Sequence, residues 1–356
     1  MVASETRSHA DYSVGWICAL PKEQTAATAM LDKRHPDLQK PLNDTNTYTL
    51  GSIGPHNVVI ACLPKGQYGT NSAANVAALM IRTYPSIKIG LMVGIGGGIP
   101  PKVRLGDVVV STPGGQYPGV VQWDLGKATA DGAFERTGAL SNPPSSLLTA
   151  LAKLETEHEL TGSKIPDFLD ELKQKYPRLA KKYLRSDSLQ DVLFRADYSH
   201  AHESPMDTEG PTGGAIEYAE EEEDEEEGSE EEEDGGPCLF CDKSKIVKRK
   251  RRSMRVHYGL VASGNKVIKD GLFRDKLNSS LGGSVLCFEM EAAGLMNNFP
   301  CLVIRGICDY CDSHKNKAWQ EHAAAVAAAF AKELLGCIPL SDVERERLIR
   351  DVMNEG

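Results

Sequence analysis

The sequence predicts an α/β protein with a central mixed sheet flanked by helices, and three observations support this class. Short apolar segments alternate with helical segments near both ends of the chain. The chain has 356 residues, of which 41% are hydrophobic and 25% are charged, which suits a large packed domain. A long polar stretch separates the two alternating parts, so we expect one domain that is interrupted by an insertion.

The first half begins with a β-branched and aromatic segment, residues 14–20, that leads through Pro21 into a helical segment, 22–31. We therefore predict a strand, a turn and a helix there. The alanines of residues 71–84 indicate a helix that lies close to a sheet. The other expected elements of this half are strands at 57–63, 88–93 and 107–111 and a glycine-rich loop at 94–98.

The alternation resumes after residue 255. We expect strands at 256–262, 284–288 and 301–307, and helices at 290–299 and in the alanine-rich segment 319–335. The predicted domain covers 13–340, between a flexible N-terminus at 1–12 and a C-terminal tail at 341–356. Its insertion, 127–255, includes helical pieces at 145–157 and 165–176. An acidic loop at 217–236 is expected to be disordered, because like charges repel one another.

Composition argues against several partners. The formal net charge is −10, but residues 217–255 alone hold 15 acids and 8 bases, so the rest of the chain is close to neutral. A near-neutral body lacks the basic face that nucleic acid requires, and no apolar run is long enough to span a membrane. The first residues lack the apolar core of a secretory signal. We expect a cytoplasmic protein whose nine cysteines are reduced thiols.

Polar or glycine residues follow several predicted strands, where open α/β sheets usually bind their ligands. These residues are Glu23, the loop 94–98, Glu289 with Glu291, and Arg305 with Asp309. Each has a plain structural interpretation as well, because a glycine loop can be a tight turn and an acid at a helix start stabilises the helix dipole. Two carboxylates leaving an apolar strand must face solvent or a hydroxyl-rich ligand, and a sugar fits.

Taken together, these residues resemble the purine and uridine phosphorylase superfamily, whose nucleoside phosphorylases and methylthioadenosine nucleosidases cleave or exchange the N-glycosidic bond of nucleosides. The resemblance covers residues 14–126 and 256–335, and the detailed sequence looks most like the fungal nucleosidase-like branch. It implies a three-layer nucleoside-phosphorylase-like fold and a homo-oligomer, a dimer or larger. We expect no cofactor.

The resemblance implies a role for each matching residue. Glu291 would bind the ribose 2′ and 3′ hydroxyls, and Met290 would pack under the sugar. Asp309 would protonate purine N7 as a general acid, Glu23 would activate water, and Arg305 would help to hold that water and acid. The other expected substrate contacts are Glu289, Ile95, Gly96 and Gly97, with Val267 and Ile268 near the base and Trp319 on the 5′ side.

The main question about the reaction is whether water or phosphate is the nucleophile. Phosphorylases similar to this chain bind phosphate through an Arg before the glycine loop and a hydroxyl inside it, where this chain has Met92 and Ile95. Phosphate needs fixed hydrogen-bond donors, and the backbone amides of Gly96 and Gly97 alone would bind it more weakly than an Arg does. Glu23 would repel phosphate but accept a proton from water, so we predict a hydrolase.

The predicted function is a purine nucleosidase that acts on adenosine-type nucleosides or nucleotides. Two alternatives remain open: a phosphate-dependent phosphorylase, and a nucleotide-sensing module that binds without turnover. The loop 312–317 is basic, so that His314, Lys315 and Lys317 either meet a 5′ substituent or form an exposed surface loop.

A second pattern lies in the insertion. Cys238 and Cys241 have the spacing of zinc ligands, and His200 and His202 precede them. Zinc fingers usually show two complete ligand pairs at short separation, whereas here the acidic run separates the histidines from the cysteines. These residues therefore either form a structural zinc site or bind no metal. The sequence assigns no metal.

Two further motifs have competing interpretations. The C-x-x-C of Cys308 and Cys311 lies at a strand end and favours buried thiols over redox chemistry. The basic run from Lys248 to Arg252 is a nuclear import signal, a nucleic-acid patch or a segment that neutralises the acidic loop.

Overall fold

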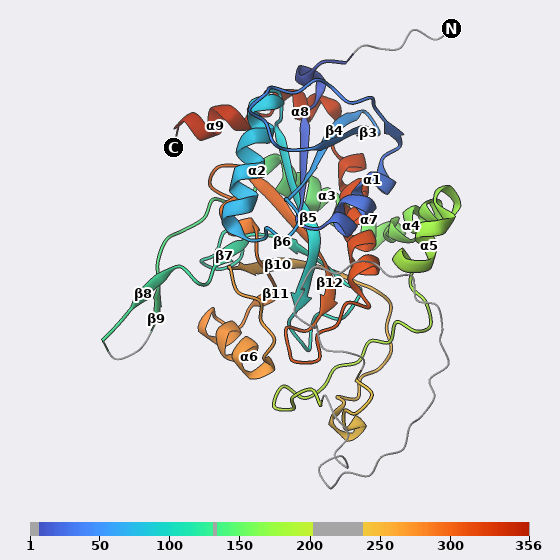
Figure 1. The fold of residues 1–356 in the computed structure, drawn as a ribbon, viewed down its shortest axis with the longest axis vertical. Coiled ribbons are helices and arrows are strands. Elements are labelled where there is room, and N and C mark those ends of the chain that lie inside the picture. Colours follow the sequence, from blue (N-terminus) through green and yellow to red (C-terminus); the bar gives the residue numbers. More distant parts are fainter. Residues whose placement is uncertain (1–6, 131–133, 202–237, 356) are drawn as a thin grey trace, which may run out of the picture.

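A mixed sheet runs through the centre of the computed structural model, which describes residues 7–130, 134–201 and 238–355 (Figure 1). The predicted acidic loop 217–236 and His202 lie outside these residues. The strand order is β11-β10-β6-β12-β5-β1-β4-β3-β2, and β7 also pairs with β10. The strands are β1 Val14–Cys18, β2 Lys33–Arg34, β3 Tyr48–Ile53, β4 His56–Cys62, β5 Ile89–Gly98, β6 Val108–Ser111, β7 Val120–Gln122, β10 Val256–Ser263, β11 Val285–Glu289 and β12 Cys301–Asp309.

Helices cover both faces of the sheet, with α2 on one face and α1 and α7 on the other (Figure 1). The helices are α1 Pro21–Met30, α2 Thr70–Thr83, α3 Ser145–Thr161, α4 Ile165–Lys175, α5 Pro177–Tyr183, α6 Gly271–Ser280, α7 Gln320–Cys337, α8 Leu340–Arg345 and α9 Ile349–Glu355. Short 3₁₀ helices lie at His9–Asp11, Lys243–Lys245 and Ala292–Gly294. A separate pair of strands, β8 Gly126–Ala128 and β9 Phe134–Arg136, projects from the body.

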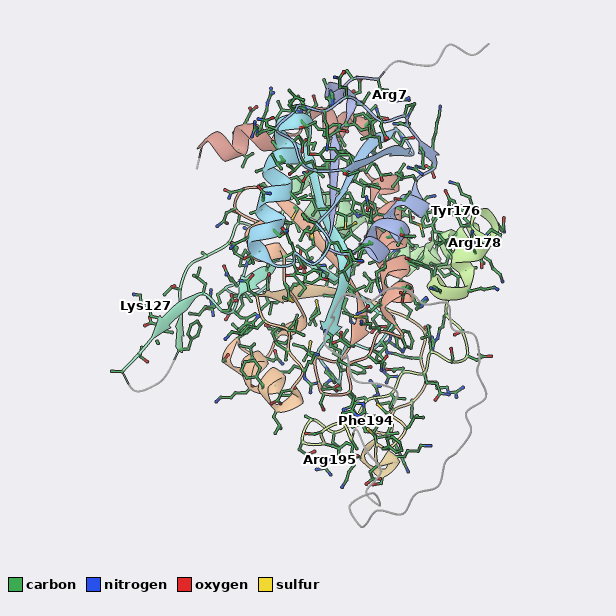
Figure 2. All side chains as sticks on the ribbon, in the orientation of Figure 1. Arg7, Lys127, Tyr176, Arg178, Phe194 and Arg195 are labelled. Atoms are coloured by element: carbon green, nitrogen blue, oxygen red, sulfur yellow. The ribbon has the colours of Figure 1, made fainter. Side chains whose placement is uncertain are left out.

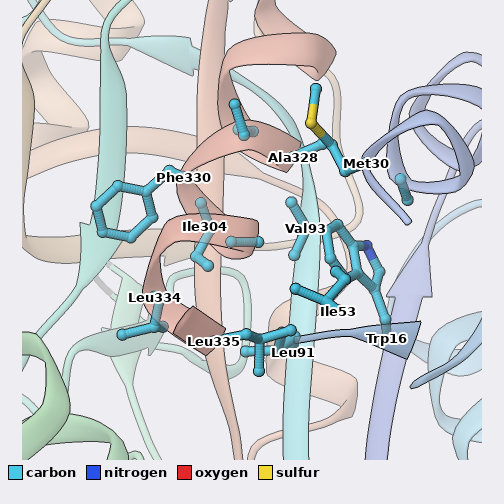
Figure 3. Packing of buried hydrophobic residues seen from close by; sticks show 14 of the residues in the cluster. Trp16, Met30, Ile53, Leu91, Val93, Ile304, Ala328, Phe330, Leu334 and Leu335 are labelled. Atoms are coloured by element: carbon cyan, nitrogen blue, oxygen red, sulfur yellow. The ribbon is translucent and has the colours of Figure 1, made fainter. Parts of the chain in front are cut away.

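Alternation along the buried strands supplies a core on each face of the sheet. Trp16 packs into the cluster under α1 and α7, whereas its neighbour Ile17 belongs to the cluster under α2. Figure 3 shows the first cluster, in which Trp16, Leu91 and Ile304 from three strands meet Ala328 of α7. The central strands are therefore apolar on both faces, as expected for parallel strands covered by helices.

Small side chains allow α7 to lie directly on β12. A Cβ atom at Gly306 of β12 would overlap the backbone of Ala323, so only glycine fits at this contact. The α7 alanines 323–325 and 327–329 are almost fully buried. This contact fixes the strand that carries Arg305 and Asp309.

The structure confirms the predicted fold class, a mixed sheet flanked by helices. The first strand, the helix after it and the alanine-rich closing helix form close to their expected positions, as β1, α1 and α7. Sequence patterns missed β3, β7 and α6, which are short or carry no regular apolar period.

Two predicted elements were wrong. The glycine-rich residues 94–98 are not a loop but the second half of β5, which pairs with β12 as far as Asp309. The predicted helix 290–299 is replaced by the 3₁₀ helix Ala292–Gly294 and turns. Gly294 there approaches the backbone of Thr70 too closely for any side chain, so tertiary contact with α2 decides the conformation.

The segments expected at the two ends and in the insertion contribute to the core. Tyr12 is fully buried, although 1–12 was expected to be flexible. The predicted tail 341–356 contains most of α8 and all of α9, with Val343 and Ile349 buried. Within the insertion, Leu147 and Leu151 of α3 pack into the cluster beneath α7.

No single helix in the described residues is long and apolar enough to cross a membrane. The bent pair of α7 and 340–352, at 84° to each other, passes that test by length and composition only. The buried alanine faces of α7 account for its apolar composition.

Candidate active site

The topology brings the predicted site residues to neighbouring strand ends. β5 lies between β1 and β12 and is parallel to both, with Gly94 in register with Arg305 and Gly97 with Asp309. The end of β11 pairs antiparallel with β5, Phe288 opposite Gly97, which places Glu289 beside them. Glu23, in the first turn of α1, reaches the same point from β1.

Arg305 is the buried centre of the group. Its Nη2 forms an ion pair with Glu289 Oε2 and lies 3.4 Å from Glu291 Oε2. Nη1 donates a hydrogen bond of 3.4 Å to the carbonyl of Ile95. With its side chain 1% exposed, Arg305 is the counterion of a buried acidic cluster.

Glu23 is held by three backbone N–H groups. Its Oε2 accepts from Ala19 at 2.6 Å and Leu20 at 3.0 Å, and its Oε1 accepts from Ile95 at 2.8 Å. Burial raises the pKa of Glu23 above its ordinary value, although Arg305 and these hydrogen bonds act in the opposite direction. A carboxylate has about four acceptor sites, so the fixed group keeps room for one more donor such as water.

The glycines of β5 make space for the charged groups. A Cβ atom at Gly94 would overlap the Glu23 carboxylate and the Arg305 guanidinium, and one at Gly97 would overlap Cys311 and lie 2.7 Å from Asp309 Oδ1. The predicted importance of the glycine run thus has a steric cause. These glycines are needed for close approach rather than for a turn.

The two carboxylates of the 289–291 run have different environments. Glu289 accepts hydrogen bonds from the N–H groups of Glu291 and Ala292 and pairs with Arg305, so it faces neither solvent nor an open ligand position. That correction follows from the buried guanidinium, which sequence reasoning did not place there. Glu291 accepts a 3.3 Å hydrogen bond from the N–H of Gly69 and is 5% exposed.

Substrate binding should depend on the ionisation of Glu291. Burial raises its pKa to about 7, with Glu289 and Glu23 adding to the rise and Arg305 opposing it. The resemblance implies that this carboxylate accepts the ribose hydroxyls. For that role kcat/KM should fall roughly tenfold per pH unit below pH 7, where the carboxylate becomes protonated. The measurement is a pH profile of kcat/KM for wild type and Glu291→Gln. A wild-type profile that stays flat well below pH 7 would contradict the assignment, as would an unchanged profile in the variant.

Asp309 is paired with a lysine that sequence analysis had assigned to the 5′ side or to the surface. Lys315 Nζ lies 3.1 Å from Asp309 Oδ2, and the N–H of Cys311 donates to Oδ1 at 2.8 Å. Burial raises the pKa of Asp309, but the Lys315 charge and the hydrogen bonds outweigh it and hold the pKa below its ordinary value. Lys315 is thus not part of an exposed surface loop, which was one of the two interpretations of residues 312–317.

The remaining predicted contacts are spread around this centre. Met290 is half-buried, and Ile268 is buried in a cluster with Phe288 and Cys311. Val267 is 52% exposed. Trp319 packs against Cys308 and Ala323, and its indole nitrogen donates to the carbonyl of Gln190 at 3.4 Å. Its ring is enclosed by protein.

Two residues near the site had not been identified from the sequence. Gly69, at φ 91°, precedes α2 and donates to Glu291. Asn265 Oδ1 accepts from both the N–H and the hydroxyl of Thr70 at 3.0 Å. A glycine before an alanine-rich helix was the available signal for the first of these.

The positions expected to decide the nucleophile offer phosphate little. Met92 is fully buried in the cluster under α2. The Ile95 amide, which lies in the glycine run, is already used by Glu23. A second anion at this point would meet the Glu23 carboxylate.

The basic run is occupied by internal ion pairs. Arg249 Nη2 lies 2.8 Å from Asp191 Oδ1, and Arg252 donates to both oxygens of the buried Asp107. Within the described residues, these two aspartates therefore neutralise two of its arginines. Cys308 and Cys311 are buried, and all nine cysteines are free thiols.

A central sheet between two layers of helices places the acidic cluster at the strand ends. Solved structures share this fold at low sequence identity. Futalosine hydrolase of Helicobacter pylori is 16% identical with a TM-score of 0.54, covering 92% of this chain and 99% of that chain. The 5′-methylthioadenosine/S-adenosylhomocysteine nucleosidase of the same organism is 14% identical with a TM-score of 0.53, covering 92% and 98%.

Three relatives match by sequence, whereas no family model matches. A nucleotide-binding leucine-rich repeat (NLR)-like protein of Hyaloscypha variabilis is 45% identical over 343 residues. The match covers 95% of this chain but 30% of that protein, so the chain spans less than a third of its length. The 5′-methylthioadenosine/S-adenosylhomocysteine nucleosidase of Mycobacterium bovis is 21% identical, covering 92% of this chain and 97% of that protein.

Proposed function

We propose that this chain is a purine nucleosidase that hydrolyses the N-glycosidic bond of adenosine-type nucleosides or nucleotides to free base and ribose or its phosphate. The observation that carries the proposal is the Glu23 carboxylate, fixed by three backbone amides beside Arg305 and Glu291. Nucleosidases are also among the proteins that share its fold.

The charge of the cluster suits a cationic transition state. Glu23, Glu289 and Glu291 surround one guanidinium, so the fully ionised group carries a net negative charge. Positive charge develops on the sugar as a glycosidic bond breaks, and a fixed negative environment stabilises it. The raised pKa values of Glu23 and Glu291 are the cost of holding that environment away from water.

Each group then has a separate task. Glu291 accepts the ribose hydroxyls, Met290 packs under the sugar, and Glu23 takes a proton from the attacking water. Asp309 gives a proton to N7 of the leaving base. Because the ion pair with Lys315 keeps Asp309 ionised, substrate must loosen that pair and Asp309 must take up a proton from solvent before the glycosidic bond breaks. Arg305 positions the carboxylates through its ion pairs. The proposal also includes that the chain forms a homo-oligomer, as the resemblance implies, and acts in the cytoplasm.

A second candidate is a nucleotide-sensing module that binds without turnover. It is favoured by the NLR-like relative, of which this chain matches only a part. A module of that kind would need Glu291 but would have no use for a water-activating Glu23 or for an N7 acid. The presence of both side chains in the site favours the enzyme.

One experiment separates these candidates. Purified protein is incubated with adenosine, inosine, 5′-methylthioadenosine or ATP, with and without phosphate, and free base is scored by chromatography. Base release without phosphate, absent from the Asp309→Asn variant, supports the nucleosidase. Binding of a nucleotide without release of base from any substrate supports the sensing module.

A further inference from the structure

Three metal-ligating side chains meet in the insertion, away from the acidic cluster. They are His200, Cys238 and Cys241, whose ligand atoms all lie within 4.8 Å of one another. Cys241 Sγ is 3.4 Å from His200 Nδ1. A tetrahedral zinc ion with ordinary Zn–S and Zn–N bonds separates such atoms by about 3.6 Å, so this pair already has nearly the required spacing.

The backbone around the cluster is held before any metal binds. Segments 193–200 and 238–247 are joined by hydrogen bonds from Arg195 N to Lys245 O and from Val247 N to Leu193 O, at 3.0 and 2.8 Å. The N–H of Asp242, next to Cys241, donates to the Tyr198 hydroxyl at 2.7 Å. Both segments are therefore fixed relative to each other. Figure 2 places Phe194 and Arg195 at the opposite end of the molecule from Arg7.

The cluster also touches the loop that carries the site lysine. The N–H of His200 donates to Ser313 Oγ at 3.0 Å. The His200 ring is stacked on that of His314, with centroids 5.6 Å apart, and His314 in turn stacks on Phe194 at 4.0 Å. Lys315, the ion-pair partner of Asp309, is the next residue in this loop. An ion that fixes His200 would thereby fix the 312–315 loop.

Ligand type points to zinc among the common metals. Two thiolates and an imidazole suit Zn²⁺, and the C-x-x-C spacing is typical of its sites. With both thiols deprotonated and the imidazole neutral, the two negative charges balance the ion. This neutral product fits a place where Cys241 is 5% exposed and the other two residues are half-buried.

We propose that His200, Cys238 and Cys241 bind one zinc ion that ties the insertion to the loop beside Asp309. A fourth ligand comes from outside this set. Binding converts two thiols to thiolates and releases their two protons to solvent, and the imidazole coordinates in its neutral form. The proposal is independent of the proposed hydrolytic activity, because it concerns metal content and not turnover.

The test is the metal content of the 356-residue chain, purified under reducing conditions and dialysed against zinc. Wild type should hold one zinc per chain, and cobalt substitution should give the charge-transfer absorption of thiolate ligands. Cys238→Ser and Cys241→Ser should each lose most of the zinc. Cys337→Ser, at a half-buried thiol outside the cluster, is the matched control and should retain it.

A second variant keeps the test decisive if a serine substitution disturbs folding. Cys238→His keeps a zinc ligand but cannot form a disulfide, so it should bind zinc where Cys238→Ser does not. Wild-type protein without zinc after reduction and zinc dialysis would overturn the proposal. So would a Cys238–Cys241 disulfide in the isolated chain that excludes the metal, or zinc retained by the Cys238→Ser, Cys241→Ser double variant.

Discussion

Glu23→Gln should lower the rate of base release by roughly 10²–10⁴-fold, because the amide cannot take a proton from the attacking water. That loss corresponds to about 3–5 kcal/mol in the activation barrier. Glutamine has the shape of glutamate but the wrong hydrogen-bonding groups, since both carboxylate oxygens accept backbone N–H groups. One of its ends must present an NH₂ group to another donor, which costs about 1–3 kcal/mol of folding stability.

The measurement is single-turnover base release, with thermal unfolding recorded for the same preparations. Glu321→Gln is the matched control. Glu321 of α7 pairs with Lys22, the residue before Glu23 in α1, but lies outside the acidic cluster. The control should keep the wild-type rate. A folded Glu23→Gln protein that releases base at the wild-type rate would remove Glu23 from the mechanism.

Asp309→Asn should lower turnover by roughly 10²-fold or more, the usual contribution of a positioned general acid. The asparagine keeps the shape and can still accept from the N–H of Cys311, but it leaves Lys315 without its carboxylate partner, so thermal unfolding is recorded for the same protein. The measurement compares kcat for a purine substrate with kcat for an analogue whose leaving group needs no protonation. Equal loss of rate on both substrates would contradict the acid role.

Lys315→Met provides an independent check on the same residue. With the ammonium removed, burial dominates, and the pKa of Asp309 should rise. The protonated acid then persists to higher pH, so the alkaline limb of the kcat profile should move upward. A limb in the same place as in wild type would show that Asp309 does not set it.

The elements that carry the site were predictable because their signals are local. The apolar segment before Pro21 and the alternation around Arg305 indicate buried strands whatever the rest of the chain does. The side chains Glu23, Glu291 and Asp309 follow such strands, and parallel pairing brings strand ends together. Their position at strand ends therefore selected these three carboxylates together with Glu289, and the family resemblance supplied their roles.

Other features depend on contacts between distant segments and carry no local signal. The glycines of β5 look like a turn in the sequence, but their lack of side chains leaves space for Glu23 and Arg305. Glu289 could not be separated from Glu291 without knowing that a buried guanidinium lies against it. The ion pair of Lys315 with Asp309 likewise arises from the fold of a loop, which residue composition does not determine.

The identity of the nucleophile tests the account most directly. The reaction is run in ¹⁸O-labelled water with phosphate present, and the sugar product is analysed by mass spectrometry. Because the Ile95 amide is occupied by Glu23 and Met92 is buried, we predict free reducing sugar with ¹⁸O on its anomeric carbon, formed at a rate independent of phosphate. Ribose 1-phosphate or its 5′-substituted equivalent as the product, formed only when phosphate is present, would contradict the hydrolase assignment.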